Sequence, residues 1–407
     1  MHKVNVENLF FVLLAAAGCV LYMPIRAFLE MGAATGAFSE ELVARNFLLI
    51  RGVTPFVTLS LVFYFLHSWG YKYSRGLISC VLFYFAICFA YVFLGGGAAY
   101  DKNGINVQAY NLGFLFTHLL CLGLGVFLRR VLKFKKTILV LWAGMILQVV
   151  SNFDVALMSL AIGELDSEKF GVYLLYGDTF VVWSLIATAA LRGSYIRALV
   201  FLVSLAVSFV LYSRTSFFAL VMVSPFLLIG LPKTFRFSVL LIALASLIYG
   251  AVSVGSQLSE HRMLEFLFAG NDGSLYYRQL QAEVGIKSLL SSWVFGDYAG
   301  QVRDFGEVGA YIHSFVSYWQ QFGIFVFCIV VYLLLRCAKE WFFVFKKRSL
   351  WASEQPALFL YLFPVVAFEI IFSRAYVYPY FWLLIGTLFA QVRFIRQNCV
   401  GKTSFSS

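Results

Sequence analysis

The stretch His313–Leu335, HSFVSYWQQFGIFVFCIVVYLLL, begins with polar side chains and continues as an apolar run without a charged residue. Its length matches the roughly 17–25 residues that a helix needs to cross a bilayer. It follows the one long polar segment of the chain, residues 255–312, which exceeds the usual upper limit of about 12–15 residues for a connecting loop. Aromatic and aliphatic residues are frequent in that segment, so we expect it to fold as a lid over a site in the membrane. Within it, Leu258–Phe268 and Leu275–Leu290 are each expected to form an amphipathic helix on the membrane surface.

The rest of the chain is strongly apolar. Of its 407 residues, 61% are hydrophobic and 13% are charged, and the mean hydropathy is +0.85. A soluble protein could not bury so many apolar side chains, so the composition indicates a membrane protein. The sequence predicts an all-α polytopic fold, a single transmembrane domain over residues 1–407 with about 12 spans. The predicted spans are 8–29, 46–67, 76–95, 108–128, 137–160, 171–191, 195–212, 214–231, 237–254, 313–335, 356–373 and 379–395.

The net charge of +11 comes from basic residues at the ends of the apolar runs. They concentrate in alternate loops, for example around Arg129 and Lys346, as cytoplasmic segments do under the positive-inside rule. This distribution predicts that both termini are cytoplasmic and that the long loop, residues 255–312, faces outward. It also disfavours nucleic acid as a partner. The seven cysteines have no metal-ligand spacing and no nucleotide-binding motif is present, so we expect neither a metal nor a cofactor.

Several ionisable residues lie in or near the ends of predicted spans, where a charge costs about 2.5–3.5 kcal/mol unless it faces a cavity or a partner. Most of them fall in the outward half, which predicts a hydrated, charged vestibule beneath the long loop. The candidates to line it are Arg51, Asp154, Asp178, Glu369 and Arg374. The alternative is a structural role, such as an ion pair of Arg51 with Asp154 or Asp178.

His313 is the candidate catalytic residue, because a neutral imidazole can accept a proton near pH 7. Ser317 and Gln320 follow it at i, i+4, i+7 spacing and therefore share its helix face, where they are further candidates to line the cavity. The alternative interpretation is a histidine that only caps a helix at the membrane interface.

Arg214 and Arg278 are the candidate phosphate-binding cations. A guanidinium group binds phosphate oxygens through a planar fork and stays charged in apolar surroundings. Arg214 stands in the short turn between two predicted spans, and Arg278 stands in the long loop. Taken singly, each is also compatible with an anchor at the membrane interface.

Four local motifs resemble the bacterial O-antigen polymerase and ligase superfamily. They are an outer turn with an arginine (213–216, SRTS), an arginine in a long outer loop (277–279, YRQ), a glycine-bearing turn (294–300, VFGDYAG) and a histidine that opens the next span (313–324, HSFVSYWQQFGI). The overall layout matches over nearly the whole chain. The family's His-Asn opening is replaced here by His313-Ser314.

The resemblance implies a metal-independent membrane glycosyltransferase of the C type in the bacterial inner membrane. Its donor would be an oligosaccharide on undecaprenyl pyrophosphate, transferred with inversion at the periplasmic face. By the same resemblance Arg214 and Arg278 would hold the pyrophosphate, His313 would activate the acceptor hydroxyl, and a chain-length regulator protein would be a partner.

Three functions are compatible with the sequence. A polymerase would add lipid-linked glycan to the end of another lipid-linked repeat unit, and this is the interpretation that we favour. A ligase would transfer the finished glycan to the lipid A core. A flippase for lipid-linked oligosaccharides belongs to another class and would place its site near the middle of the membrane, open to each side in turn. The charges here gather on one side, which disfavours it.

Overall fold

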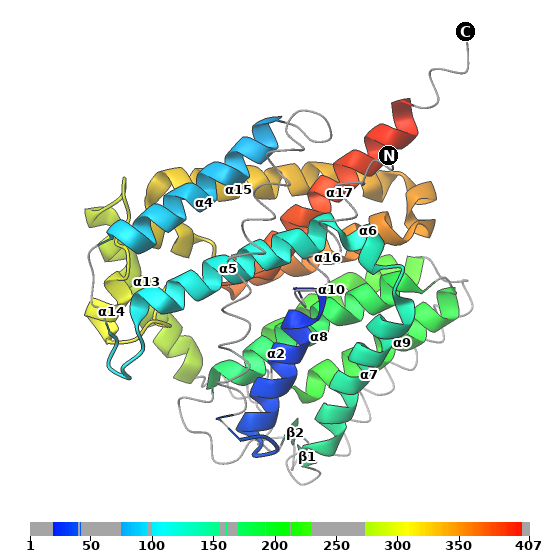
Figure 1. The fold of residues 1–407 in the computed structure, drawn as a ribbon, viewed down its shortest axis with the longest axis horizontal. Helices are drawn as coiled ribbons and strands as arrows, with labels where there is room; N and C mark the ends of the chain where they lie inside the picture. Colours follow the sequence, from blue (N-terminus) through cyan, green and yellow to red (C-terminus); the bar gives the residue numbers. More distant parts are fainter. Residues whose placement is uncertain are drawn as a thin grey trace, which may run out of the picture.

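The chain folds into a bundle of helices (Figure 1). The computed structural model describes residues 19–39, 41, 75–95, 100–154, 159–160, 170–191, 193–211, 213–229 and 273–400. The helices of these parts are α2 (Cys19–Ala34), α4 (Arg75–Leu94), α5 (Val107–Val126), α6 (Leu128–Val131), α7 (Lys135–Ser151), α8 (Phe170–Ala190), α9 (Ser194–Val210), α10 (Arg214–Ile229), α13 (Gly273–Ser291), α14 (Gly300–Phe305), α15 (Val316–Lys346), η3 (Arg348–Ala352), α16 (Glu354–Phe372) and α17 (Tyr380–Val400).

Within the described residues, four helices are long and apolar enough to cross a membrane. They comprise Gly76–Leu94, Val107–Val126, Val316–Lys346 and Glu354–Phe372, and each coincides with a predicted span. Shorter apolar helices lie within α8, α9, α10 and α17, again where spans are predicted. The helical membrane architecture expected from the composition is therefore confirmed for these parts of the chain.

The predicted span 137–160 is wrong at its outer end. α7 stops at Ser151, and strands β1 (Phe153–Asp154) and β2 (Ser159–Leu160) then pair antiparallel, so the chain turns back. The helix ends here because its last side chains compete for the backbone: Ser151 Oγ and Asn152 Nδ2 both donate to the carbonyl of Gln148, at 3.0 and 2.7 Å. A hydropathy window does not register this competition.

The end of α15 differs by more. The helix expected over 313–335 begins at Val316 and continues to Lys346, because hydropathy marks the apolar run and not the end of the helix. The break expected at Ser213-Arg214 is present, since α9 ends at Val210 and α10 starts at Arg214. The surface helix expected over 275–290 corresponds to α13. The predicted spans 46–67 and 237–254 and the surface helix expected over 258–268 lie outside the described residues.

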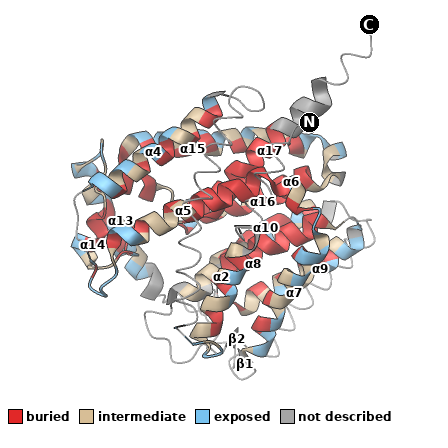
Figure 2. Ribbon diagram, viewed as in Figure 1, coloured by how far each residue is buried: buried red, intermediate tan, exposed pale blue. Residues whose placement is uncertain are grey.

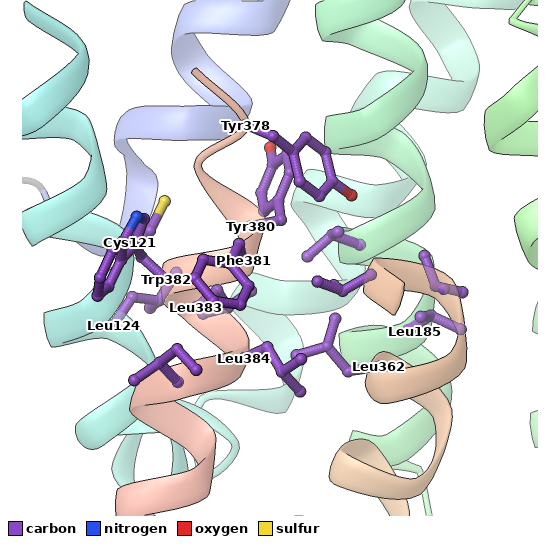
Figure 3. Close-up of a cluster of buried hydrophobic side chains, with 14 of the residues drawn as sticks. Cys121, Leu124, Leu185, Leu362, Tyr378, Tyr380, Phe381, Trp382, Leu383 and Leu384 are labelled. Atoms are coloured by element: carbon purple, nitrogen blue, oxygen red, sulfur yellow. The ribbon is translucent and has the colours of Figure 1, made fainter. Parts of the chain in front are cut away.

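The core of the bundle is built from α5, α8, α16 and α17 (Figure 2). Every described side chain of residues 176–190 and 380–392 is buried, so α8 and the first half of α17 are enclosed on all sides. The close-up in Figure 3 shows Tyr380, Trp382 and Leu384 of α17 among side chains from α5, α8 and α16. A helix that is apolar all round belongs at the centre of such a bundle.

The backbones of α5 and α17 touch where two glycines face each other. A Cβ atom on Gly386 would meet the carbonyl of Leu122 and lie 2.8 Å from the Cα of Gly125. A Cβ atom on Gly125 would lie 2.7 Å from the Cα of Gly386. Lipid removes most of the hydrophobic drive for helix association, so membrane helices depend on such close packing at small residues.

Gly125→Ala should therefore destabilise the bundle by about 1–3 kcal/mol, because the added methyl group overpacks the contact between α5 and α17. Gly113→Ala on the same helix is the matched control, since nothing lies within 4 Å of its added Cβ. Unfolding of both variants in detergent, followed by circular dichroism, measures the effect. Equal midpoints for the two variants would contradict the proposed backbone contact.

Candidate active site

His313 lies in the turn before α15, and α13 packs on its neighbour Ile312 at Gly285. The helices α13 and α14 lie together at one end of the bundle (Figure 1). Its half-buried ring packs 5.6 Å from the ring of Tyr311. The imidazole is hydrogen-bonded to the backbone of Ser373, in the turn between α16 and α17. Burial, followed by the charges of Arg278 and Arg374, lowers the pKa of His313 to about 3. The ring is therefore neutral near pH 7, as a proton acceptor must be.

The amphipathic helix α13 brings Arg278 to this histidine. Its inner face carries the buried Gln281, Gly285 and Leu289, and Arg278 precedes Gly285 by seven residues on the same face. A Cβ atom on Gly285 would lie 2.6 Å from Ile312 Cγ1 and 2.9 Å from Gln320 Nε2. The missing side chain thus lets α13 lie directly on the segment that holds His313. Arg278 itself is half-buried, and its charge acts on His313.

Arg214 is the first residue of α10, and the described part of the structure includes its backbone but not its side chain. The turn around it is closely packed. Ser213 Oγ and Ser216 Oγ are 2.6 Å apart, and Ser216 Oγ donates to Asp178 Oδ1 at 2.8 Å. A Cβ atom on Gly177 would lie 2.7 Å from Ser213 Cβ, so this glycine allows α8 and α10 to meet.

Asp178, Glu369 and Arg374 form a buried charge cluster. Arg374 Nη2 donates to Asp178 Oδ1 at 2.6 Å, and Arg374 Nε lies 3.3 Å from Glu369 Oε2. The three residues are only 7%, 1% and 8% exposed, respectively. Two of the predicted vestibule carboxylates thus surround one guanidinium. Among the described residues Asp178 pairs with Arg374. Arg51, the partner considered from the sequence, lies outside them.

The polar side chains that follow His313 in α15 are buried, and their hydrogen bonds join α15 to the neighbouring loop segments. Gln320 Oε1 accepts from the N–H of Ile312 at 3.1 Å. Gln321 Oε1 accepts from the N–H of Ala299 at 3.0 Å, and Ser317 Oγ accepts from the N–H of Tyr376 at 2.8 Å. These side chains satisfy backbone donors of three segments, so they hold the site together.

A break in α15 at Gly323 receives the loop between α13 and α14. Gly323 has φ 78° and ψ 179°, a conformation that only glycine adopts readily. The N–H of Ile324 donates to the carbonyl of Val294 at 3.1 Å, and the N–H of Asp297 donates to the carbonyl of Gln320 at 2.6 Å. The backbone groups freed by the break are thus satisfied by the loop.

Sequence reasoning missed three residues of this end of the bundle. Asn111 Nδ2 donates to the hydroxyl of Tyr298 at 3.0 Å, and the hydroxyl of Tyr376 donates to Asn111 Oδ1 at 3.0 Å. Asn111 therefore connects α5 with the loop before α14 and with the turn after α16. An amide one helical turn inside a mostly apolar span was the available signal.

Two predicted residues cannot be placed in this arrangement. Arg51 lies outside the described residues, and for Asp154 only the backbone, in β1, is described. Of the other candidates, the structure brings His313, Arg278, Ser317, Gln320, Asp178, Glu369 and Arg374 to one end of the bundle, together with the backbone of Arg214.

In comparisons with known proteins, no protein-family model and no curated protein matches the chain.

The titration of His313 has a consequence for stability. Its pKa of about 3 in the folded protein lies below the unfolded value of about 6.5. Between these values the unfolded chain binds more protons, so the folded state should lose stability as the pH falls below about 6.5. His313→Gln should flatten this dependence. Thermal unfolding in detergent between pH 7 and pH 4 measures it, and parallel curves for wild type and variant would contradict a buried neutral imidazole.

Proposed function

We propose that the chain is an O-antigen polymerase, a glycosyltransferase that lengthens a lipid-linked surface polysaccharide. The observation that carries the proposal is that the charge of Arg278, on α13, acts on His313, in the turn before α15, and lowers its pKa. Transfer of a glycan from a pyrophosphate carrier requires a proton acceptor and a phosphate-binding cation, and these two residues would supply them. The four local motifs quoted from the sequence support the same activity.

The reaction would be a direct displacement. The acceptor hydroxyl oxygen attacks the anomeric carbon of the donor glycan while His313 accepts its proton. The bond between that carbon and the phosphate oxygen breaks, and the undecaprenyl pyrophosphate leaves with the electron pair. Arg278, together with Arg214, would stabilise the charge that develops on the pyrophosphate. Attack opposite to the leaving group inverts the anomeric centre.

The membrane arrangement that goes with this activity has about 12 spans, both termini in the cytoplasm and the long loop in the periplasm. Lys135 Nζ lies 2.7 Å from Glu354 Oε1, which joins the first residue of α7 to the first residue of α16 at one end of the bundle. The described basic residues Arg129, Arg130 and Lys346 lie in α6 or at the end of α15 on that side. The helices α13 and α14 lie at the opposite end (Figure 1), and α13 packs on the segment of His313 at Gly285. The proposed site would thus face the periplasm across the inner membrane.

Deletion of the gene should leave the cell's lipopolysaccharide with a single repeat unit on the core, and the wild-type gene should restore a ladder. His313→Ala at equal membrane abundance should lower elongation by roughly 10²- to 10⁴-fold, the usual contribution of a general base. A lipopolysaccharide gel reads out both effects. Bare core with long chains left on the carrier would indicate the ligase. An unchanged ladder would contradict the polymerase function and would favour the flippase function.

Arg278→Lys should also impair elongation, by about 10- to 100-fold, because an ammonium group cannot reproduce the two-pronged contact of a guanidinium with phosphate oxygens. Arg303→Lys is the matched control, since Arg303 is exposed on α14 and pairs with Asp297 and Asp304. Elongation rates of membranes that contain each variant provide the measurement. Equal rates for the two variants would exclude Arg278 from the pyrophosphate site.

A further inference from the structure

The turn between α16 and α17, residues 373–379, lies against the segment that holds His313. Ser317 Oγ, one helical turn after His313, accepts from the N–H of Tyr376 at 2.8 Å. The ring of Tyr311 lies 5.3 Å from the ring of Tyr376 and 5.6 Å from the ring of His313. A backbone hydrogen bond with Ser373 also raises the pKa of His313, against the larger effect of burial. The position of this turn therefore fixes the surroundings of the His313 ring.

Several contacts hold this turn in place. The N–H groups of Ser373 and Arg374 both donate to the carbonyl of Glu369, at 2.9 and 2.6 Å, which ends α16. Tyr376 is held by Ser317 through its backbone and by Asn111 through its hydroxyl. The strongest of these anchors is charged: the Arg374 guanidinium lies between the carboxylates of Asp178 and Glu369.

Arg374 is unlike Arg278 in one respect that bears on its role. It is 8% exposed and is enclosed by the buried side chains of Asp178 and Glu369. To bind a phosphate it would have to leave them, and a buried carboxylate without its partner is strongly unfavourable. Arg278 is only half-buried on α13, so a ligand can reach it without such a loss. The two arginines are therefore suited to different tasks.

The same cluster reaches the other half of the site. Asp178 Oδ1 accepts from Ser216 as well as from Arg374, so one carboxylate oxygen joins the first turn of α10 to the turn after α16. Arg214 stands in that first turn of α10. Gly177 lets the two helices meet at this point, because any side chain there would collide with Ser213.

We propose that Arg374 is a positioning residue: held by Asp178 and Glu369, it fixes the turn that sets the surroundings of the His313 ring, and it ties this turn to the start of α10. The inference rests on the proposed function of the same site. According to this proposal, the buried charge cluster holds His313 and the turn of Arg214 at fixed positions relative to each other. Contact with the substrate is left to the other two arginines.

Arg374→Lys tests the proposal, because lysine keeps the charge but cannot bridge two carboxylates with a planar fork. With purified protein and a lipid-linked donor, kcat should fall about 100-fold, the scale of a misplaced general base, while the KM for the donor stays unchanged. Arg336→Lys is the matched control, since Arg336 on α15 pairs only with Glu340 among the described residues, at 3.5 Å. Its kinetics should equal those of the wild type.

A second readout does not depend on activity. Nuclear magnetic resonance of ¹⁵N-histidine-labelled protein in detergent resolves the tautomer of each imidazole, and the signal lost in His313→Gln identifies His313 among the five histidines. The wild type should show one tautomer at this position, and Arg374→Lys should show a mixture. Tyr376→Phe releases the same turn without changing its charge, and it replaces Arg374→Lys if that variant does not fold.

The outcomes separate the two proposals. A mixed tautomer with lower kcat and unchanged KM would support the positioning role. An unchanged tautomer and kcat would overturn it, and so would a raised donor KM at unchanged kcat, which would place Arg374 on the substrate. A mixed tautomer in a protein whose wild type transfers no glycan would support the positioning of His313 and overturn the proposed function.

Discussion

The site depends on a guanidinium buried between two carboxylates. Asp178 belongs to α8, Glu369 to α16 and Arg374 to the turn that follows α16. Each of these charges would be unfavourable alone inside an apolar bundle. Their pairing constrains the positions of the elements that carry them, because removal of one partner leaves another charge buried without compensation. Three elements that are distant in the sequence are therefore held at one fixed distance.

Backbone contact at glycine is the second constraint. Gly125 and Gly386 let α5 and α17 touch, Gly177 admits the first turn of α10, and Gly285 admits α13 onto the segment of His313. At Gly323 the helix α15 opens and takes its missing hydrogen bonds from a loop. These contacts share one physical origin. Where lipid weakens the hydrophobic drive, association depends on how closely backbones can approach.

The arginines of the proposed site illustrate how position decides the role of a residue. A guanidinium can bind phosphate where a ligand can reach it, and it holds helices together where buried carboxylates enclose it. Arg374 is enclosed in this way, whereas Arg278 is half-buried on α13. A sequence motif contains an arginine in either case, so the motif alone does not distinguish them.

Much of this protein was determined by the sequence itself. Apolar runs predicted helices where α4, α5, α15 and α16 are found, and the amphipathic pattern over 275–290 predicted α13. These features depend on local periodicity and on the length of the bilayer, so a sequence contains them in full. His313 and Arg278 could also be named as candidates from the sequence, because each belongs to one of the four local motifs.

Only the tertiary structure decided the partners. The pairing of Asp178 with Arg374, the buried role of Ser317 and Gln320, and the link of Asn111 to Tyr376 join residues from separate helices. Hydropathy averages over a window and carries no information on which side chains meet. The contacts between these side chains depend on how closely the helices pack, which is a property of the whole bundle.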